Sequence, residues 1–250
     1  LISNQINYSV LIKMYNKKKF IKNFKKVNNF FKSNNFLDVD AKLDEDSMKL
    51  FLTLVLNTNT KEIVESGVYK GYSTNVLNKF GKKFGINVTS FEYYNTRYLK
   101  TLSKKFNIIQ ENSFSGIPKI LKKLKKKKCA ILLDGPKRSL AVSFSYFLYN
   151  NFNNITFISL DDTNLLNNNC DHLPNFSLQL NYEKKMGLKK KNSRERGALI
   201  FDDKIKHYFV HKGLRRFPIN PFFFHFFYKI HLFRFYQKIF RFYQWVDLKW

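Results

Sequence analysis

Short apolar runs alternate with longer amphipathic stretches between residues 61 and 212. Uncharged apolar runs are typical of strands buried on both faces of a parallel sheet, and apolar positions three or four apart are typical of helices. This βαβ alternation predicts a mostly parallel α/β sheet flanked by helices. The predicted strands lie at residues 63–64, 87–92, 106–110, 130–133 and 155–160, and the helices near residues 73–84, 94–105, 117–127 and 139–150.

Helices are predicted before this alternation, and a hairpin is predicted at its end. The first helix covers residues 7–32, and the second begins at Asp44 or Asp46, where acidic residues suit the positive end of the helix dipole. Residues 197–201 and 206–210 flank a polar segment and predict an antiparallel hairpin. We therefore expect three parts: an N-terminal helical segment (1–60), a main α/β domain (61–212) and a C-terminal tail (213–250).

The tail combines many aromatic side chains with regularly spaced cations. Its longest uncharged stretch, residues 217–228, is too short to span a bilayer as a helix. Arg234, Lys238 and Arg241 share one face of a helix, whereas Lys229 does not. A basic aromatic helix of this kind predicts peripheral contact with an anionic membrane. The alternative is a helix packed on the main domain or on a second subunit, as in a homodimer.

Composition indicates one main domain and a strong attraction to polyanions. The 250 residues include 45 Lys and Arg against 18 Asp and Glu, a net charge of +27. Only eight of the basic residues are Arg, which is the residue favoured for phosphate and base recognition. The abundance of Lys, Asn, Phe, Ile and Tyr is also what A/T-rich coding produces. Nucleic acid is therefore the less favoured partner.

The two cysteines, Cys129 and Cys170, have no disulfide or metal-binding spacing, which indicates a reducing compartment. Residues 1–31 contain many lysines and no continuous apolar signal-peptide core. We expect a cytoplasmic protein, with the tail able to bring it to a membrane surface. The chain begins with Leu1 rather than Met, which is compatible with a fragment or an unusual start codon.

The segment Glu65-Ser-Gly-Val-Tyr-Lys-Gly-Tyr-Ser-Thr74 joins the first predicted strand to a helix. Gly67 and Gly71 can adopt backbone angles closed to other residues, and the N–H groups of the new helix can face a ligand. Tyr69 replaces the second glycine of a dinucleotide fingerprint, which disfavours a pyrophosphate. The motif resembles that of class I S-adenosylmethionine-dependent methyltransferases, closest to the metal-dependent catechol, caffeoyl-CoA and macrocin O-methyltransferase-like branch. The alternative is a turn with incidental glycines.

This resemblance implies a Rossmann-like class I methyltransferase sheet, mostly parallel with a C-terminal antiparallel hairpin, that binds S-adenosylmethionine. It implies that Glu92 accepts hydrogen bonds from the ribose hydroxyls, a role that suits an acceptor-only carboxylate. Asn112 and Ser113 fall at adenine-facing positions, although many relatives carry an aspartate nearby. A solvated strand-end charge is the alternative for Glu92, and a plain polar turn is the alternative for Asn112. The other implied cofactor-binding residues are Glu65, Gly67, Tyr69, Gly71, Ser73 and Asp134.

The resemblance also implies a Mg²⁺ site and a catalytic base. Asp134 follows the fourth strand and Asp161 and Asp162 follow the fifth, matching the metal ligands of the family, and such oxygen ligands suit Mg²⁺. Lys137 matches a general base, and His172 lies in a polar connection where substrate loops belong. The alternatives are strand-end acids, with Asp161 capping a helix, a surface lysine and an ordinary loop histidine.

The implied activity is methyl transfer from S-adenosylmethionine to an oxygen of a small molecule or glycan. A second hypothesis is a non-catalytic Rossmann-like module that binds a membrane surface or polyanion through its basic aromatic tail. A third hypothesis, nucleic-acid methylation, agrees with the charge, but the chain has no N-P-P-[YF] motif for amino-group methylation.

Overall fold

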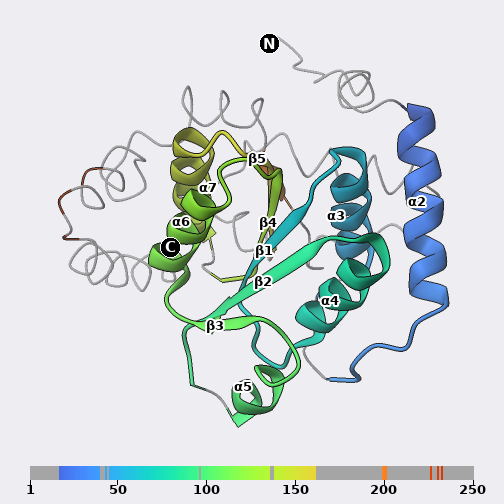
Figure 1. Cartoon of the computed structure of the whole chain (residues 1–250), viewed down its shortest axis with the longest axis horizontal. Helices are drawn as coiled ribbons and strands as arrows, with labels where there is room; N and C mark the ends of the chain where they lie inside the picture. Colours follow the sequence, from blue (N-terminus) through green and yellow to red (C-terminus); the bar gives the residue numbers. More distant parts are fainter. Residues whose placement is uncertain are drawn as a thin grey trace, which may run out of the picture.

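In the part of the chain that the computed structural model describes, a six-stranded sheet with helices on both faces forms the centre (Figure 1). The structure describes residues 17–39, 43, 45–95, 97–135, 138–161 and 199–201, together with residues 226, 230 and 232. The strand order is β3-β2-β1-β4-β5-β6; the first five strands in sequence are parallel, and β6 is antiparallel to β5. The strands are β1 Glu62–Ser66, β2 Asn87–Glu92, β3 Ile108–Gln110, β4 Cys129–Leu133, β5 Ile155–Leu160 and β6 Leu199–Phe201. The predicted mostly parallel, Rossmann-like α/β sheet is confirmed.

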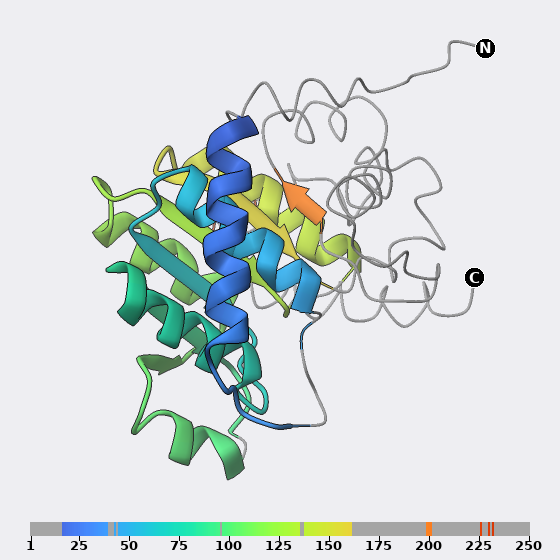
Figure 2. The same ribbon diagram turned by 90° about the vertical axis from the view of Figure 1, so that its right-hand side faces the viewer.

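Helices α2, α3 and α4 lie on one side of the sheet, and α6 and α7 lie on the other (Figure 1). Turning the molecule by 90° shows that α2 is the outermost helix, packed over α3 (Figure 2). The short helix α5 lies near the carboxyl end of β2. The bounds are α2 Lys17–Lys32, α3 Glu45–Asn57, α4 Tyr72–Phe84, α5 Arg97–Leu102, α6 Ser113–Lys123 and α7 Arg138–Asn151.

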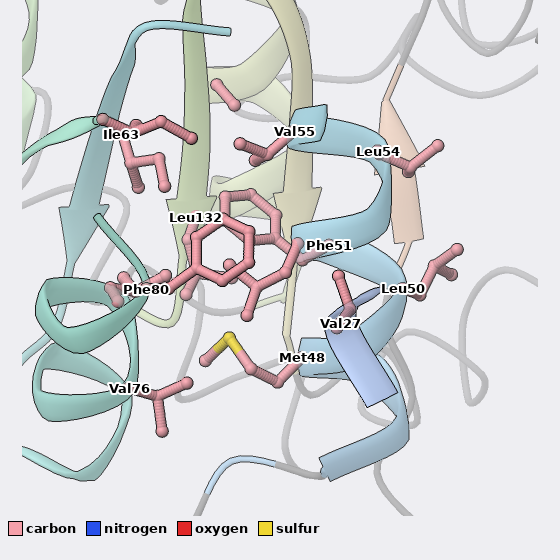
Figure 3. Close-up of a cluster of buried hydrophobic side chains, with 14 of the residues drawn as sticks. Val27, Met48, Leu50, Phe51, Leu54, Val55, Ile63, Val76, Phe80 and Leu132 are labelled. Atoms are coloured by element: carbon pink, nitrogen blue, oxygen red, sulfur yellow. The ribbon is translucent and has the colours of Figure 1, made fainter. Parts of the chain in front are cut away.

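Each face of the sheet has its own apolar core, because successive residues of a strand point to opposite sides. Ile63 of β1 and Leu132 of β4 pack with α3 and α4, as Figure 3 shows. Their neighbours Val64 and Leu133 pack with α6 and α7. The ring of Phe51 in α3 lies 5.4 Å from that of Phe157 in β5, centroid to centroid. The N-terminal helices therefore share one core with the sheet.

The ends of the elements differ from prediction where side chains decide them. The helix predicted near residues 117–127 begins earlier, at Ser113, because the Asn112 side chain accepts a hydrogen bond from Phe114 N at 3.0 Å and caps it. Helix α5 is shorter than predicted, and β3 begins at Ile108. The first strand of the predicted hairpin is β6, and its second strand, 206–210, lies outside the described residues.

The parallel strands all end at one edge of the sheet, where their loops converge. The chain runs outward from β1 through β2 and β3, and then returns to place β4 on the other side of β1. This reversal of strand order lies between β1 and β4, and it is where open α/β sheets bind their ligands. The loop after β1 lies at this point.

The contact between α4 and α5 yields a prediction about two glycines. Gly71 precedes α4 with φ 83°, and a Cβ atom there would lie 2.6 Å from Leu102 Cδ1. Gly85 follows α4 with φ 65°, and no atom of the described residues lies within 4 Å of such a Cβ atom there. Gly85→Ala should therefore lower the free energy of unfolding by about 1–2 kcal/mol, because alanine is strained at this backbone angle. Gly71→Ala should cost roughly 1–3 kcal/mol more, because Leu102 must move. Denaturant unfolding measures both costs.

A Leu102→Ala background provides the control, because it removes the atoms that the new methyl group would meet. In that background the cost of Gly71→Ala should fall to that of Gly85→Ala. Equal costs for the two glycine variants in the native background would show that Leu102 does not pack against Gly71.

Candidate functional site

The turn between β1 and α4 is held in an uncommon backbone conformation. Gly67, Tyr69 and Gly71 all have positive φ, at 94°, 45° and 83°. This conformation is accessible to glycine but costs a residue with a side chain, such as Tyr69, about 1–2 kcal/mol. Strained residues persist where the surrounding structure fixes them, and they are frequent at ligand-binding sites.

The carboxylate of Glu92, at the end of β2, binds the turn through its backbone. Its Oε2 atom accepts hydrogen bonds from Val68 N at 3.0 Å and Tyr69 N at 2.9 Å, and its Oε1 atom accepts one from Tyr94 N at 3.0 Å. A carboxylate oxygen accepts about two hydrogen bonds, so Oε1 has capacity for one further donor. Glu92 is buried and is therefore no solvated strand-end charge. It compensates the strain at Tyr69, a function that sequence reasoning did not identify.

The segments that follow β1 and β4 lie so close together that residue 67 must be a glycine. The carbonyl oxygen of Ser66 accepts hydrogen bonds from Asp134 N at 2.9 Å and Gly135 N at 3.1 Å. The Ser66 hydroxyl also donates to the carbonyl oxygen of Gly135. A Cβ atom on Gly67 would lie only 3.1 Å from Gly135 N. The backbone of the β4 loop, as well as the positive φ, accounts for glycine at this position.

Glu65 of β1 is fully buried beside this turn. Its Oε2 atom accepts hydrogen bonds from Thr74 Oγ1 at 2.7 Å and Ser90 Oγ at 2.6 Å. Burial raises the pKa of Glu65 to about 7; the nearby hydroxyl groups of Ser73, Ser90 and Thr74 oppose the rise, and the charge of Asp134 adds to it. Within the described part of the chain, its Oε1 atom has no hydrogen-bond partner.

The N-terminus of α4 lies next to Glu65. Gly71 is the N-cap residue and supplies no side-chain hydrogen bond to the first turn of the helix. Thr74 in that turn contacts the Glu65 carboxyl group directly. The positive end of a helix dipole favours a negatively charged group. A buried acceptor oxygen and a helix end that suits an anion therefore lie side by side.

The predicted adenine-facing residues lie at the start of α6. The Asn112 oxygen caps the helix, so it is already bonded to Phe114 N, and Ser113 is half-buried as the first helical residue. Glu111 forms an ion pair nearby, with Lys119 Nζ at 2.5 Å from its Oε1. The structure thus gives Asn112 a capping function, and contact of Asn112 and Ser113 with adenine stays a prediction.

Two of the three predicted metal ligands lie on neighbouring strands. Asp134 follows β4 and Asp161 follows β5, whose last residues pair in register, and Asp161 N donates to Leu133 O at 2.9 Å. Asp161 is buried and Asp134 is half-buried. The described residues contain no group of three His, Cys, Asp or Glu side chains that could hold a metal. Asp162, Lys137 and His172 lie outside the described residues, so the metal site and the base stay predictions.

An exposed aromatic surface follows Glu92, and the sequence analysis missed it. Tyr93 and Tyr94 are 55% and 64% exposed, and their ring centroids are 5.4 Å apart. Tyr69, also 55% exposed, lies on the neighbouring turn, where Lys70 Nζ is 5.5 Å from its ring centroid. Two aromatic residues directly after a strand-ending acid were the signal in the sequence. Such rings provide a surface on which a flat ring can pack.

The structure describes three residues of the tail, Phe226, Ile230 and Leu232, and all three are exposed. Ile230 N donates a hydrogen bond to Phe226 O at 3.1 Å. In the described part of the chain, no helix is long and apolar enough to cross a membrane. The predicted membrane contact of residues 213–250 involves mostly undescribed residues and stays a prediction.

Two solved structures are similar to this chain. A proposed caffeoyl-CoA O-methyltransferase from Staphylococcus aureus has 18% identity and a TM-score of 0.37, with 73% of this chain and 89% of that protein covered. An SAH-bound methyltransferase from Podospora anserina has 14% identity and a TM-score of 0.41, with 86% and 90% covered. Both of these proteins are described as methyltransferases. No protein-family model and no curated protein matches the chain. The likeness is remote, so the chemistry must be read from the side chains themselves.

The raised pKa of Glu65 predicts a pH-dependent stability. The folded protein holds this proton up to about pH 7, whereas the unfolded chain releases it near pH 4.5. The contribution of Glu65 to the free energy of unfolding therefore has its full value below pH 4.5 and decreases as the pH rises to 7. The total decrease is roughly 3 kcal/mol. Glu65→Gln cannot ionise and should lack this decrease in urea unfolding.

Glu111→Gln is the matched control for this measurement. The hydrogen bond from Lys119 lowers the pKa of Glu111, so its removal should not reproduce the effect of Glu65→Gln. Identical pH profiles for wild type and Glu65→Gln would show that Glu65 has the same pKa in the folded and unfolded states and would contradict the prediction.

Proposed function

We propose that this protein transfers a methyl group from S-adenosylmethionine to an oxygen of a small molecule or glycan. The observation that carries the proposal is the buried Oε1 atom of Glu65 beside the N-terminus of α4, which has no hydrogen-bond partner among the described residues. The amino-acid end of this cofactor carries one ammonium and one carboxylate group. The Glu65 oxygen suits the ammonium, and the helix N-terminus suits the carboxylate.

The surrounding residues suit the rest of the cofactor. Glu92 Oε1 retains one acceptor position for a ribose hydroxyl, and the exposed rings of Tyr93 and Tyr94 suit a purine. Ser113, the first residue of α6, would face the adenine. The turn has no second glycine of the dinucleotide type, since Tyr69 stands at that position. This set of groups favours a nucleoside with an amino-acid tail over a dinucleotide.

Methyl transfer requires the sulfur, the methyl carbon and the acceptor oxygen in line, so positioning supplies much of the catalysis. The acceptor hydroxyl must also lose its proton. Lys137 would take that proton, with His172 as the alternative base. Asp134, Asp161 and Asp162 would hold Mg²⁺, and a bound Mg²⁺ would lower the pKa of the acceptor hydroxyl. The resemblance of the motif supports these assignments.

The second hypothesis, a non-catalytic module that binds a membrane or polyanion through residues 213–250, uses the same fold without turnover. A screen of the full chain with labelled S-adenosylmethionine against candidate acceptors separates the two. Transfer of label to an acceptor supports the enzyme. Binding of the cofactor with no transfer to any acceptor tested favours the module.

Cofactor binding is tested by calorimetry with S-adenosylhomocysteine. The intact chain should bind it, and Gly67→Val should abolish binding, because a side chain at φ 94° would press on the backbone of Gly135 and displace the turn. Gly85→Val is the control, since it replaces another positive-φ glycine in open space at the far end of α4. Circular dichroism verifies both folds. Tight binding of NAD, with none of S-adenosylhomocysteine, would overturn the proposal.

The metal assignment is tested by direct binding of Mg²⁺ in calorimetry. Asp161→Asn should weaken Mg²⁺ binding at least tenfold, about 1.4 kcal/mol, while S-adenosylhomocysteine still binds. Glu111→Gln removes an acid after β3 and should leave Mg²⁺ affinity unchanged. A chelator should also stop turnover. Full activity in excess chelator would instead indicate a metal-free mechanism with Lys137 or His172 as the base.

A further inference from the structure

A groove of about 670 Å³ lies at the opposite end of the sheet from the β1–α4 turn, where β4 and β5 begin. Five lysines of residues 122–128 line it, together with asparagines from the end of α7 and the turn before β5. Leu121, Phe147 and Phe152 also line it. The lysines are exposed, whereas Leu121 and Phe147 are buried and Phe152 is half-buried. The groove therefore has a basic rim and an apolar floor.

Most of this positive charge has no counter-charge in the described part of the chain. Lys127 Nζ lies 2.6 Å from Glu62 Oε1, but no described ion pair involves Lys122, Lys125, Lys126 or Lys128. Lys122 lies in the last turn of α6, where a cation suits the helix dipole. The other three follow the C-cap residue Leu124, so helix stabilisation does not account for them. Their mutual repulsion would be relieved by an anionic ligand.

The shape and chemistry of the groove indicate the kind of anion. A flat bilayer surface can meet the lysines of the rim but cannot reach a recessed apolar floor. Proteins that bind single-stranded nucleic acids instead combine a row of cations with an aromatic side chain. The cations contact the phosphates, and the ring contacts a base. Lysine contacts phosphate as a point charge, and contacts to phosphate carry no information about base sequence.

We propose that this groove binds single-stranded nucleic acid through its phosphates, without sequence preference. Lys122, Lys125, Lys126 and Lys128 contact the backbone, and the accessible part of the Phe152 ring contacts a base. The groove lies at the amino ends of β4 and β5, whereas the β1–α4 turn lies at the carboxyl edge. The bound strand is therefore a tether and not the methyl acceptor, so this site is independent of the proposed enzymatic function.

Fluorescence anisotropy with a labelled 20-nucleotide oligo(dT), at several salt concentrations, tests the proposal on the full chain. The groove variant replaces Lys122, Lys125, Lys126 and Lys128 with Gln. The control variant makes the same change at four of the exposed α2 lysines, Lys18, Lys22, Lys25 and Lys26. Both variants lose four positive charges, so an effect of net charge alone is equal in the two.

The groove variant should bind at least about tenfold more weakly, and its salt slope should be shallower by roughly two to three. The control should stay within about threefold of wild type. Asn153→Asp adds one negative charge to the groove while keeping all its lysines, and it should also weaken binding. Both groove variants should retain the circular dichroism spectrum of the wild type.

Two results would overturn the proposal. Equal weakening in the groove and control variants would show diffuse attraction by net charge. Unchanged oligonucleotide affinity in the groove variant, with loss of binding to phosphatidylserine-containing vesicles, would show that the groove contacts a membrane.

Discussion

The buried carboxyl group of Glu65 connects the elements on which the site depends. It lies on β1, accepts hydrogen bonds from Ser90 on β2 and Thr74 on α4, and senses the charge of Asp134 after β4. An ionised carboxylate without a counter-charge is costly to bury. The hydrogen bonds from these hydroxyl groups and the raised pKa, which keeps the group protonated, reduce this cost. Glu65 thus joins β1 to β2 and to the first turn of α4, beside the turn that Glu92 fixes.

Local patterns predicted much of the fold, because each depends on residues close in sequence. The apolar runs of β2, β4 and β5 and the glycine turn after β1 are found where the sequence placed them. Contacts between distant residues were not predictable in the same way. That Glu92 binds Val68 and Tyr69 through their N–H groups depends on how β1 and β2 pair. The capping by Asn112 was also missed, which displaced the predicted start of α6.

The candidate site was predicted only as far as its residues lie in turns that follow predicted strands. Glu65, Gly67, Gly71 and Glu92 come together at one edge because parallel strands end there. Their work in the structure is partly architectural: Gly67 admits the backbone of Gly135, and Glu92 fixes the strained turn. A motif can thus be required by the fold and by the ligand at once, and sequence alone does not separate the two requirements.

The proton that Glu65 holds up to about pH 7 affects how a ligand would bind beside it. A cationic group placed beside the carboxyl group favours its ionised form, so binding near pH 7 would expel a proton into the solvent. The heat measured for such an association would then change with the ionisation enthalpy of the buffer. Affinity for a cation would increase with pH through the titration of Glu65, whereas a neutral analogue would show no such coupling. The molecule would carry a built-in preference between ligands that differ only in charge.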